Sequence, residues 1–404
     1  MPARPAIYLD SNAAAPLSPE VSEALLPLLS GFGIPNPSSI RSHGRLSKRL
    51  IAEAREKIAS SISTDPEQLI FTSSGTEANQ LAIRGCLEPA LSREGGGRPH
   101  WITTPVEHDS VLQMVEWFRG RGGEVSFLPV DADGRAQVSA MSGLWREETK
   151  LVSAVWVNNE TGVINPVAEL ASEVRARGGT FHLDAAQAWG KIPFDVESLG
   201  AHLVTVSAHK IGGLAGVGLL WVARGTQVQA VVKGKQEKGR RGGTENVLGI
   251  VAAGAAAAAI QPQAWSSKTA PLRDRLQATL CARIPGTQVN GGGAPRVAGT
   301  LNLSFDGIEG DGLVMALDLA GYSVSSGSAC SSGFLEPSHV LMALGRSKAQ
   351  AMAAIRVSLS GEMEWPTLEG FVASLEAAVA RIRKAPEARR DTYDALSESK
   401  GVSR

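Results

Sequence analysis

Short apolar runs alternate with helical stretches along the chain, and this alternation limits the fold more than any other feature. Each run ends in a polar or glycine-rich turn. The runs lie at Leu69 to Phe71, Leu151 to Val157, Thr180 to Leu183, Leu203 to Val206 and Val217 to Val222. Strands separated by helices pair in parallel through crossover connections, with helices on both faces of the sheet. The sequence therefore predicts an α/β fold with a mostly parallel central sheet flanked by helices.

The chain is too long for a single hydrophobic core, because 404 residues are typical of two domains. After an alanine-rich stretch, helical runs mix with strands at Leu301 to Phe305 and Ile355 to Leu359, and a charged tail without an apolar stripe begins at Lys384. We predict a large domain over residues 18–260 and a small α+β domain from residues 1–17 plus 261–404.

Charge and composition exclude several classes of function. Lys plus Arg equals Asp plus Glu at 40 each, which gives no support for binding nucleic acid or a membrane surface. The start, Met1 to Ile7, lacks a signal-peptide core, and the longest nearly apolar run, Leu248 to Ile260, is too short to span a bilayer. Three cysteines argue against a disulfide framework. We expect a soluble, cytoplasmic protein that acts on a small molecule and has no metal site.

Two chemically useful side chains directly follow apolar runs. Lys210 ends Ser207-Ala208-His209-Lys210, and Asp184 begins Asp184-Ala185-Ala186-Gln187. A lysine amine can hold the aldehyde of pyridoxal 5'-phosphate as a Schiff base, while a carboxylate on a neighbouring strand keeps the pyridine nitrogen protonated. Gln187 would donate to the phenolic oxygen of the ring. Singly, Asp184 is also explained as a turn or cap carboxylate, but the combination favours a site for this cofactor.

A phosphate site is indicated where Phe71 to Asn79 runs from a strand into a helix. Ser74 and Glu77 have the spacing of a capping box. The N–H groups of Gly75 and Thr76, with the Thr76 hydroxyl, would bind an anion at the positive helix end. Taken alone, the segment is better explained as an ordinary capped helix, but its occurrence together with the lysine motif favours the phosphate.

Three further side chains would complete the cofactor site. Ser207 and His209 flank the lysine and could donate to the same phosphate, and His108 follows a strand-like run at a point where its imidazole could stack on a flat ring. Singly, each histidine is also explained by packing in the core.

Cys330 lies in a loop of small residues, Ser325 to Gly333, that has no periodicity. A thiol on an exposed loop suits a nucleophile that must reach a bound substrate and then present its product elsewhere. Cys86 and Cys281 fall in helical runs, so we expect both to be inert core thiols. Cys330 is therefore the candidate nucleophile.

Arg356 is a charge within the apolar run Ile355 to Leu359, and a buried guanidinium needs a partner. One partner would be a substrate carboxylate, which arginine binds in a bidentate way, with Asn36 as an added donor. A structural ion pair with a protein carboxylate is equally compatible with the sequence.

Taken together, these motifs resemble those of the cysteine desulfurases of the NifS/IscS type, in the class V aminotransferase group of fold-type I pyridoxal phosphate enzymes. The similarity covers nearly the whole chain. Nine motifs occur in the family's order: Tyr8-Leu9-Asp10, Asn36-Pro37-Ser38-Ser39, Gly75-Thr76-Glu77-Ala78-Asn79, Glu107-His108, Asn158-Asn159-Glu160-Thr161-Gly162, Asp184-Ala185-Ala186-Gln187, Ser207-Ala208-His209-Lys210, Gly243-Thr244-Glu245-Asn246 and Ser326-Gly327-Ser328-Ala329-Cys330.

The resemblance implies a role for each candidate residue. Lys210 would link to the cofactor, Asp184 would pair with the ring nitrogen, and His108 would stack on the ring and move protons at sulfur. Gln187 and Asn159 would contact the phenolic oxygen region. Thr244 would reach the phosphate of the second subunit of a homodimer. The remaining phosphate ligands would be Gly75, Thr76, Ser207 and His209.

The implied reaction is removal of sulfur from L-cysteine, giving L-alanine and a persulfide on Cys330 that passes to a sulfur-acceptor protein for iron–sulfur cluster assembly or tRNA thiolation. The context of Cys330 resembles the long-loop group. Three segments depart from the family pattern: Ala14 to Pro16, Ile211 to Gly216 and Arg241 to Thr244. The alternatives are another class V enzyme, either a selenocysteine lyase or an aminotransferase, and a scaffold that binds the cofactor without turnover.

Overall fold

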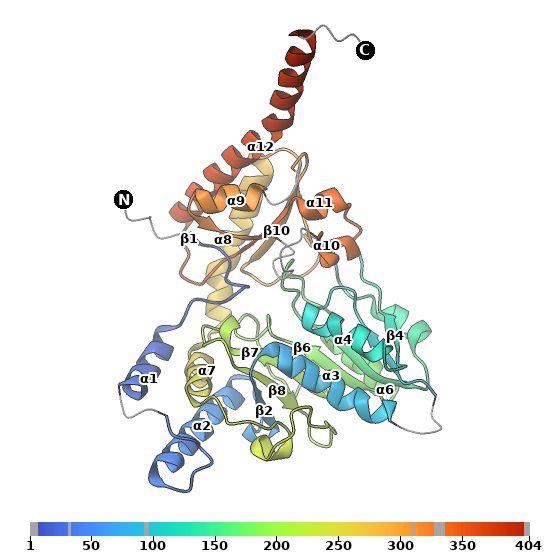
Figure 1. Cartoon of the computed structure of the whole chain (residues 1–404), viewed down its shortest axis with the longest axis vertical. Coiled ribbons are helices and arrows are strands. Elements are labelled where there is room, and N and C mark those ends of the chain that lie inside the picture. The colour runs from blue at the N-terminus through green and yellow to red at the C-terminus, as the bar shows by residue number, and fades with distance from the viewer. Residues whose placement is uncertain (1–6, 31–33, 93–96, 309–311, 327–335, 400–404) are drawn as a thin grey trace.

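The structure is a computed structural model that describes residues 7–30, 34–92, 97–308, 312–326 and 336–399, with side chains described as far as residue 384. Its central element is a seven-stranded sheet (Figure 1). In spatial order the strands are β2 (Leu69–Thr72), β8 (Gly218–Val222), β7 (Leu203–Ser207), β6 (Thr180–Asp184), β5 (Thr149–Val155), β3 (His100–Thr103) and β4 (Glu124–Phe127).

Strands β7, β6, β5, β3 and β4 pair in parallel, and β8 runs antiparallel to both of its neighbours, β7 and β2. The predicted α/β fold with a mostly parallel sheet is therefore confirmed. Strand β4 was not predicted, because its four residues are only partly buried and Glu124 and Ser126 interrupt any apolar run.

Helices cover both faces of this sheet. Successive side chains of a strand point to opposite faces, so the apolar side chains on each face need a covering layer. Ile70 packs in a cluster with Leu81, whereas its neighbours Leu69 and Phe71 belong to a cluster with Ile51 on the other face. The helices of this part of the chain are α1 (Pro19–Leu29), α2 (Ser42–Ser61), α3 (Gly75–Leu91), α4 (Asp109–Arg119), α5 (Met141–Leu144), α6 (Val167–Ala176) and α7 (Val247–Ala259).

A second, smaller sheet is antiparallel, with the strand order β12 (Ser325–Ser326), β13 (Ala354–Ser358), β10 (Thr300–Phe305) and β9 (Thr287–Val289). Its core cluster includes Leu280, Leu303 and Phe371. The accompanying helices are α8 (Pro262–Arg283), α9 (Gly312–Leu319), α10 (His339–Ala343), α11 (Lys348–Met352) and α12 (Trp365–Ser399). Helix α12 continues through the charged tail that begins at Lys384, since alanine, glutamate and arginine are good helix formers.

The N-terminal segment joins both parts of the molecule. Strand β1 (Ile7–Tyr8) pairs in parallel with β11 (Tyr322–Ser323), and the N–H of Ser358 donates to the carbonyl of Leu9. Further on, the N–H of Ser18 donates to the carbonyl of Gly212 at 3.0 Å. The division of the chain into residues 18–260 and residues 1–17 plus 261–404 stays a prediction.

Gly212 belongs to one of the segments that depart from the family pattern. Its φ is +86°, and a Cβ atom at this position would lie 2.8 Å from the carbonyl oxygen of Pro16. Glycine is therefore required both by the left-handed backbone and by the close approach of the N-terminal segment.

Among the described residues, no single helix is long and apolar enough to cross a membrane. Helices α7 and α8 satisfy that length and composition only as a pair, across a bend of 72°.

Candidate active site

Several of the predicted site residues lie at one edge of the large sheet, where parallel strands end. Asp184 is the last residue of β6, Ser207 is the last residue of β7, and Lys210 ends the short 3₁₀ turn that follows (Ala208–Lys210). His108 and Asn159 stand just beyond the ends of β3 and β5. Parallel strands carry their carboxyl ends to the same side, so this edge is the usual location of a ligand in such a sheet.

A hydrogen-bonded chain joins Asp184 to His108 through two residues that the sequence did not single out. The Asn79 amide donates to Asp184 Oδ2 at 2.8 Å and to Ser110 Oγ at 2.9 Å. His108 Nδ1 lies 2.8 Å from Ser110 Oγ and also accepts from the Ser110 N–H at 3.1 Å. Because Nδ1 is an acceptor, the proton of a neutral His108 ring belongs on Nε2.

Asn79 could have been suspected from its position. It is a fully buried polar residue on the apolar face of α3, at 1% exposure, and a buried amide requires partners. Its Oδ1 has no hydrogen-bond partner among the described residues.

Glu107, next to His108, is a second buried carboxyl group close to Asp184. Its Oε1 accepts from the Thr104 hydroxyl at 2.5 Å and from the Val155 N–H at 2.9 Å. Burial, with some contribution from the charge of Asp184, raises the pKa of Glu107 to about 8. Glu107 is therefore neutral at pH 7, and this limits the negative charge beside Asp184.

The predicted phosphate site combines the start of α3 with the end of β7. Ser74 caps α3 by accepting from the Glu77 N–H at 3.1 Å. A Cβ atom on Gly75 would lie 3.2 Å from Ser207 Cβ, so the two segments meet at a position with room for little more than a hydrogen atom. Thr76 is exposed at the same helix end. This cradle of small residues suits an anion.

The expected capping box is only half formed. The Glu77 carboxylate accepts from the Ser73 N–H at 2.7 Å instead of turning back to Ser74, and Arg241 Nε and Nη2 contact it at 2.7 and 3.0 Å. The guanidinium outcompetes the backbone of the cap because it makes two charge-assisted bonds.

His209 shares the end of β7 with Ser207, whose Oγ lies 3.0 Å from His209 Nδ1. Burial, together with the nearby positive charges of Lys210 and His108, lowers the pKa of His209 to about 4. His209 is therefore neutral at pH 7, and it would act toward a phosphate as a hydrogen-bond donor and not as a cation.

Lys210 and Gln187 meet at the N-terminal segment. Lys210 Nζ donates to the carbonyl oxygens of Asn12 and Ala13 at 2.6 and 2.8 Å, and Gln187 Nε2 donates to the same Asn12 carbonyl at 2.8 Å. The structure thus brings these two predicted residues together. Asn12 is a further site residue that sequence reasoning missed.

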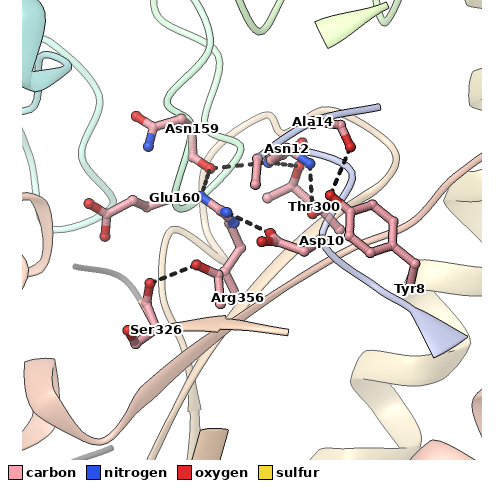
Figure 2. Close-up of polar contacts among 12 residues, drawn as sticks. Tyr8, Asp10, Asn12, Ala14, Asn159, Glu160, Thr300, Ser326 and Arg356 are labelled. Atoms are coloured by element: carbon pink, nitrogen blue, oxygen red, sulfur yellow. Dashed lines mark hydrogen bonds and ion pairs between the residues drawn. The ribbon is translucent and has the colours of Figure 1, made fainter. Parts of the chain in front are cut away.

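Arg356 forms the structural ion pair that was one of its two interpretations. Figure 2 shows its guanidinium between Asp10 and the backbone of Asn159. Nη2 lies 2.6 Å from Asp10 Oδ1, and Nη1 donates to the Asn159 carbonyl at 3.1 Å. Arg356 is 4% exposed, and its Nε has no partner among the described residues. The role of this residue toward a substrate stays a prediction.

Three predicted residues are not joined to this cluster by the contacts described. Asn36 is exposed, and its Oδ1 accepts from the Ser38 N–H in a local turn. Thr244 is exposed and lines a cavity of about 220 Å³ together with Arg241 and residues of β2. Cys330 lies outside the described residues. Their assigned roles stay predictions.

The two helix-borne cysteines differ from one another. Cys86 is partly buried, and burial raises the pKa of its thiol to about 12, as expected for an inert thiol. The expectation for Cys281 was wrong, because this residue is exposed. Helix α8 turns Leu276 and Leu280 toward the core, so the residue after Leu280 faces outward.

Comparison with known proteins agrees with this arrangement. The family described as "Aminotransferase class-V" matches residues 7–365. The cysteine desulfurase IscS of Dictyoglomus turgidum is 39% identical over 381 residues, which cover 93% of this chain and 95% of that protein. The chain belongs to the class-V aminotransferases, in the cysteine desulfurase group of the NifS/IscS type.

Solved structures confirm the fold of this class-V aminotransferase. A NifS-like protein has a TM-score of 0.84 and 30% sequence identity, covering 93% of this chain and 99% of that one. A structure described as SspA in complex with cysteine has a TM-score of 0.77 and 30% identity, covering 88% and 99% of the two chains. The fold-type I assignment is thus established.

Membership in this family implies pyridoxal 5'-phosphate, and the side chains present fit that group. Asp184 offers a buried carboxylate, Lys210 offers an amine, and the close approach of Gly75 to Ser207 forms a cradle without bulk. Each of these chemical types is one that the cofactor requires.

The raised pKa of Glu107 predicts a pH effect on stability. Between its ordinary pKa of 4.5 and about 8, the folded protein binds more protons at Glu107 than the unfolded chain does. The contribution of Glu107 to the free energy of unfolding is therefore fully present below pH 4.5 and is lost as the pH rises toward 8. We expect E107Q, which is always neutral, to lack this loss, so that it gains stability relative to the native protein between pH 5 and pH 8.

Urea unfolding at a series of pH values measures this difference. The exposed Glu116 provides a matched control, and E116Q should show no such trend. A difference between E107Q and the native protein that is constant from pH 5 to pH 8 would contradict the prediction.

Proposed function

We propose that this protein removes the sulfur of L-cysteine, giving L-alanine, and passes that sulfur from Cys330 to an acceptor protein. The observation that carries the proposal is the buried chain from Asp184 through Asn79 and Ser110 to His108, which lies at the same sheet edge as Lys210 in a chain of the cysteine desulfurase group. It supports a site with one carboxylate, one amine and one imidazole.

The cofactor would be held by Lys210 as a covalent lysine link, by Asp184 at the ring nitrogen and by Gly75, Thr76, Ser207 and His209 at the phosphate. When bound, it supplies an electron sink that stabilises negative charge at the Cα atom of the amino acid. Gln187 and Asn159 would contact the phenolic oxygen region.

Lys210 would take the Cα proton of the substrate, because its amine is the basic group that cofactor chemistry places there. Its Nζ already lies within hydrogen-bonding distance of two carbonyl oxygens, so the amine is oriented before substrate arrives. Asp184 would hold the ring nitrogen, and its carboxylate is oriented by the Asn79 amide and by the Ala186 N–H, which donates to it at 3.0 Å.

His108 would move the proton at the substrate sulfur. Two donors from Ser110 converge on Nδ1, which fixes the ring and leaves Nε2 as the reacting atom. Proton transfer by a positioned side chain typically contributes about 10² to 10⁴ in rate.

Cys330 would then attack the substrate sulfur as a thiolate. A sulfur–sulfur bond forms to Cys330 Sγ as the carbon–sulfur bond of the substrate breaks. The electron pair left on Cβ takes a proton, and Lys210 returns a proton to Cα, which gives alanine. The substrate carboxylate would bind Arg356, whose Nε is buried without a partner among the described residues, and Asn36 would add a donor.

The acceptor that receives the sulfur would serve iron–sulfur cluster assembly or tRNA thiolation. The protein would act as a homodimer, with Thr244 of each subunit completing the phosphate site of the other. Exposed leucines on and beside α1 support such a contact, because Leu26 and Leu29 are 65% and 63% exposed.

Sulfide release tests the proposed reaction. With L-cysteine and a reductant, the native protein should release sulfide and L-alanine, whereas an aminotransferase would give a 2-oxo acid and a scaffold would give neither. We expect Cys330→Ser to bind the cofactor and cysteine normally, because that binding requires Lys210 and Arg356. Its alanine production should fall to a small residual, since a hydroxyl does not replace a thiolate in attack on sulfur.

Two cysteine variants serve as matched controls for this experiment. Cys86→Ser and Cys281→Ser should keep the rate of the native protein. Near-normal alanine production by Cys330→Ser, or its loss in either control without unfolding, would remove Cys330 as the sulfur carrier.

Subunit exchange tests the contribution of Thr244 to the neighbouring site. Lys210→Ala chains mixed with Thr244→Ala chains form heterodimers in which one site carries both changes and the other carries neither. We expect that second site to regain a covalent cofactor link and the affinity of the native protein. In verified heterodimers, a cofactor affinity no better than that of the Thr244→Ala homodimer would count against the contact between subunits.

A further inference from the structure

Lys191 is a buried lysine that the proposed chemistry does not use. It is 8% exposed, and its ammonium donates to Asn12 Oδ1 at 2.7 Å and to Gln187 Oε1. Burial and the like charges of Lys210 and Arg356 lower the pKa of Lys191 well below its usual value, whereas the hydrogen bonds to two amide oxygens favour its charged form. Burying a lysine in such surroundings costs free energy unless it is hydrogen-bonded, so its hydrogen bonds indicate its role.

The ammonium fixes the orientation of two amide groups at once. It has only hydrogens to offer, so each atom that it contacts must be an oxygen. The Gln187 nitrogen therefore points the other way, where Nε2 donates to the Asn12 carbonyl at 2.8 Å. The Asn12 nitrogen is oriented in the same manner and donates to the Asn159 carbonyl at 3.1 Å and to Thr300 Oγ1 at 3.0 Å (Figure 2).

This orientation determines what Gln187 can offer to a ligand. One N–H of its Nε2 is used by Asn12, and the second is left to donate. If the amide were flipped, Nε2 would face the Lys191 ammonium, and Oε1 would face any anionic oxygen bound on the other side. Both contacts of the flipped amide are repulsive, so the cation selects one of the two orientations.

We propose that Lys191 is a positioning residue that holds Gln187 as a hydrogen-bond donor to the phenolic oxygen of the cofactor. The proposal rests on the proposed function only in that Gln187 contacts this oxygen. Lys191 itself would act through Gln187 and would not touch the cofactor.

A double-mutant cycle on cofactor binding tests this inference without measuring turnover. The dissociation constant of pyridoxal 5'-phosphate would be measured by titrating the apoproteins of the native chain, Gln187→Ala, Lys191→Met and the double variant. Loss of a hydrogen bond to a charged group should weaken binding about tenfold in Gln187→Ala and by a similar factor in Lys191→Met. The double variant should then bind within about twofold of Gln187→Ala, because Lys191 has nothing left to position.

Each contrary result has a distinct meaning. If the double variant binds the cofactor about a hundredfold more weakly than the native chain, the effects of Gln187→Ala and Lys191→Met on the dissociation constant multiply. Lys191 then does not act through Gln187, and the inference is overturned. If Gln187→Ala leaves the dissociation constant unchanged, the contact of Gln187 in the proposed function is wrong, and the inference fails with it. The exposed Lys150 gives a control, since Lys150→Met should bind the cofactor as the native chain does.

A variant of Gln187 keeps the test decisive if Lys191→Met does not fold. Gln187→Glu retains the contact with the Lys191 ammonium but replaces the donor by a second acceptor oxygen. It should bind the cofactor at least as weakly as Gln187→Ala. Binding as tight as that of the native chain would overturn the assignment of Gln187 as a donor held by Lys191.

Discussion

Parallel pairing of β3, β5, β6 and β7 is the constraint on which the candidate site depends. It carries the carboxyl ends of the four strands to one edge, although the residues that follow them are far apart in the sequence. Asp184 and Ser207 occupy the last positions of β6 and β7, so their register is set by the hydrophobic core that fixes the strands. A shift of one residue in either strand would turn the side chain to the other face of the sheet.

Buried polar contacts then set the orientation of the side chains that the sheet has brought together. Asn79 links Asp184 with Ser110, and Asn12 accepts from both Lys210 and Gln187. A buried amide that lacks its partners costs free energy, so such a network favours one arrangement of the site over others. Rigid orientation of this kind suits a site in which protons move between fixed groups.

The sequence was sufficient for most of the central sheet, although not for β4, and for the side chains that stand directly after strands. Lys210 and Asp184 could be found because a strand followed by a turn is a local pattern, and the structure places both at one edge. Asn79 and Lys191 could not be assigned in this way, since each depends on partners that are distant in the chain. The ion pair of Arg356 with Asp10 could not be predicted either, because these two residues are far apart in the sequence.

Other differences have equally local causes. Strand β4 is half exposed and therefore carries no apolar run, and Cys281 faces outward because it follows the buried Leu280 by one residue on a helix. In both cases the secondary structure is regular, but the apolar pattern that reveals burial is absent or displaced. Prediction from periodicity fails where an element lies at the margin of the core.

The path of the N-terminal segment limits the order in which the chain can fold. Residues 18–260 supply every strand of the large sheet, so this sheet can form while the rest of the chain is still being synthesised. Strand β1 must wait for β11, and Leu9 must wait for Ser358, since these partners emerge after the whole of the large sheet. Asn12 contacts Thr300 and Ser358, so the carbonyl that holds Lys210 and Gln187 reaches its final position only after residue 358 has been synthesised. A nascent chain would therefore have its strands paired well before its site is assembled.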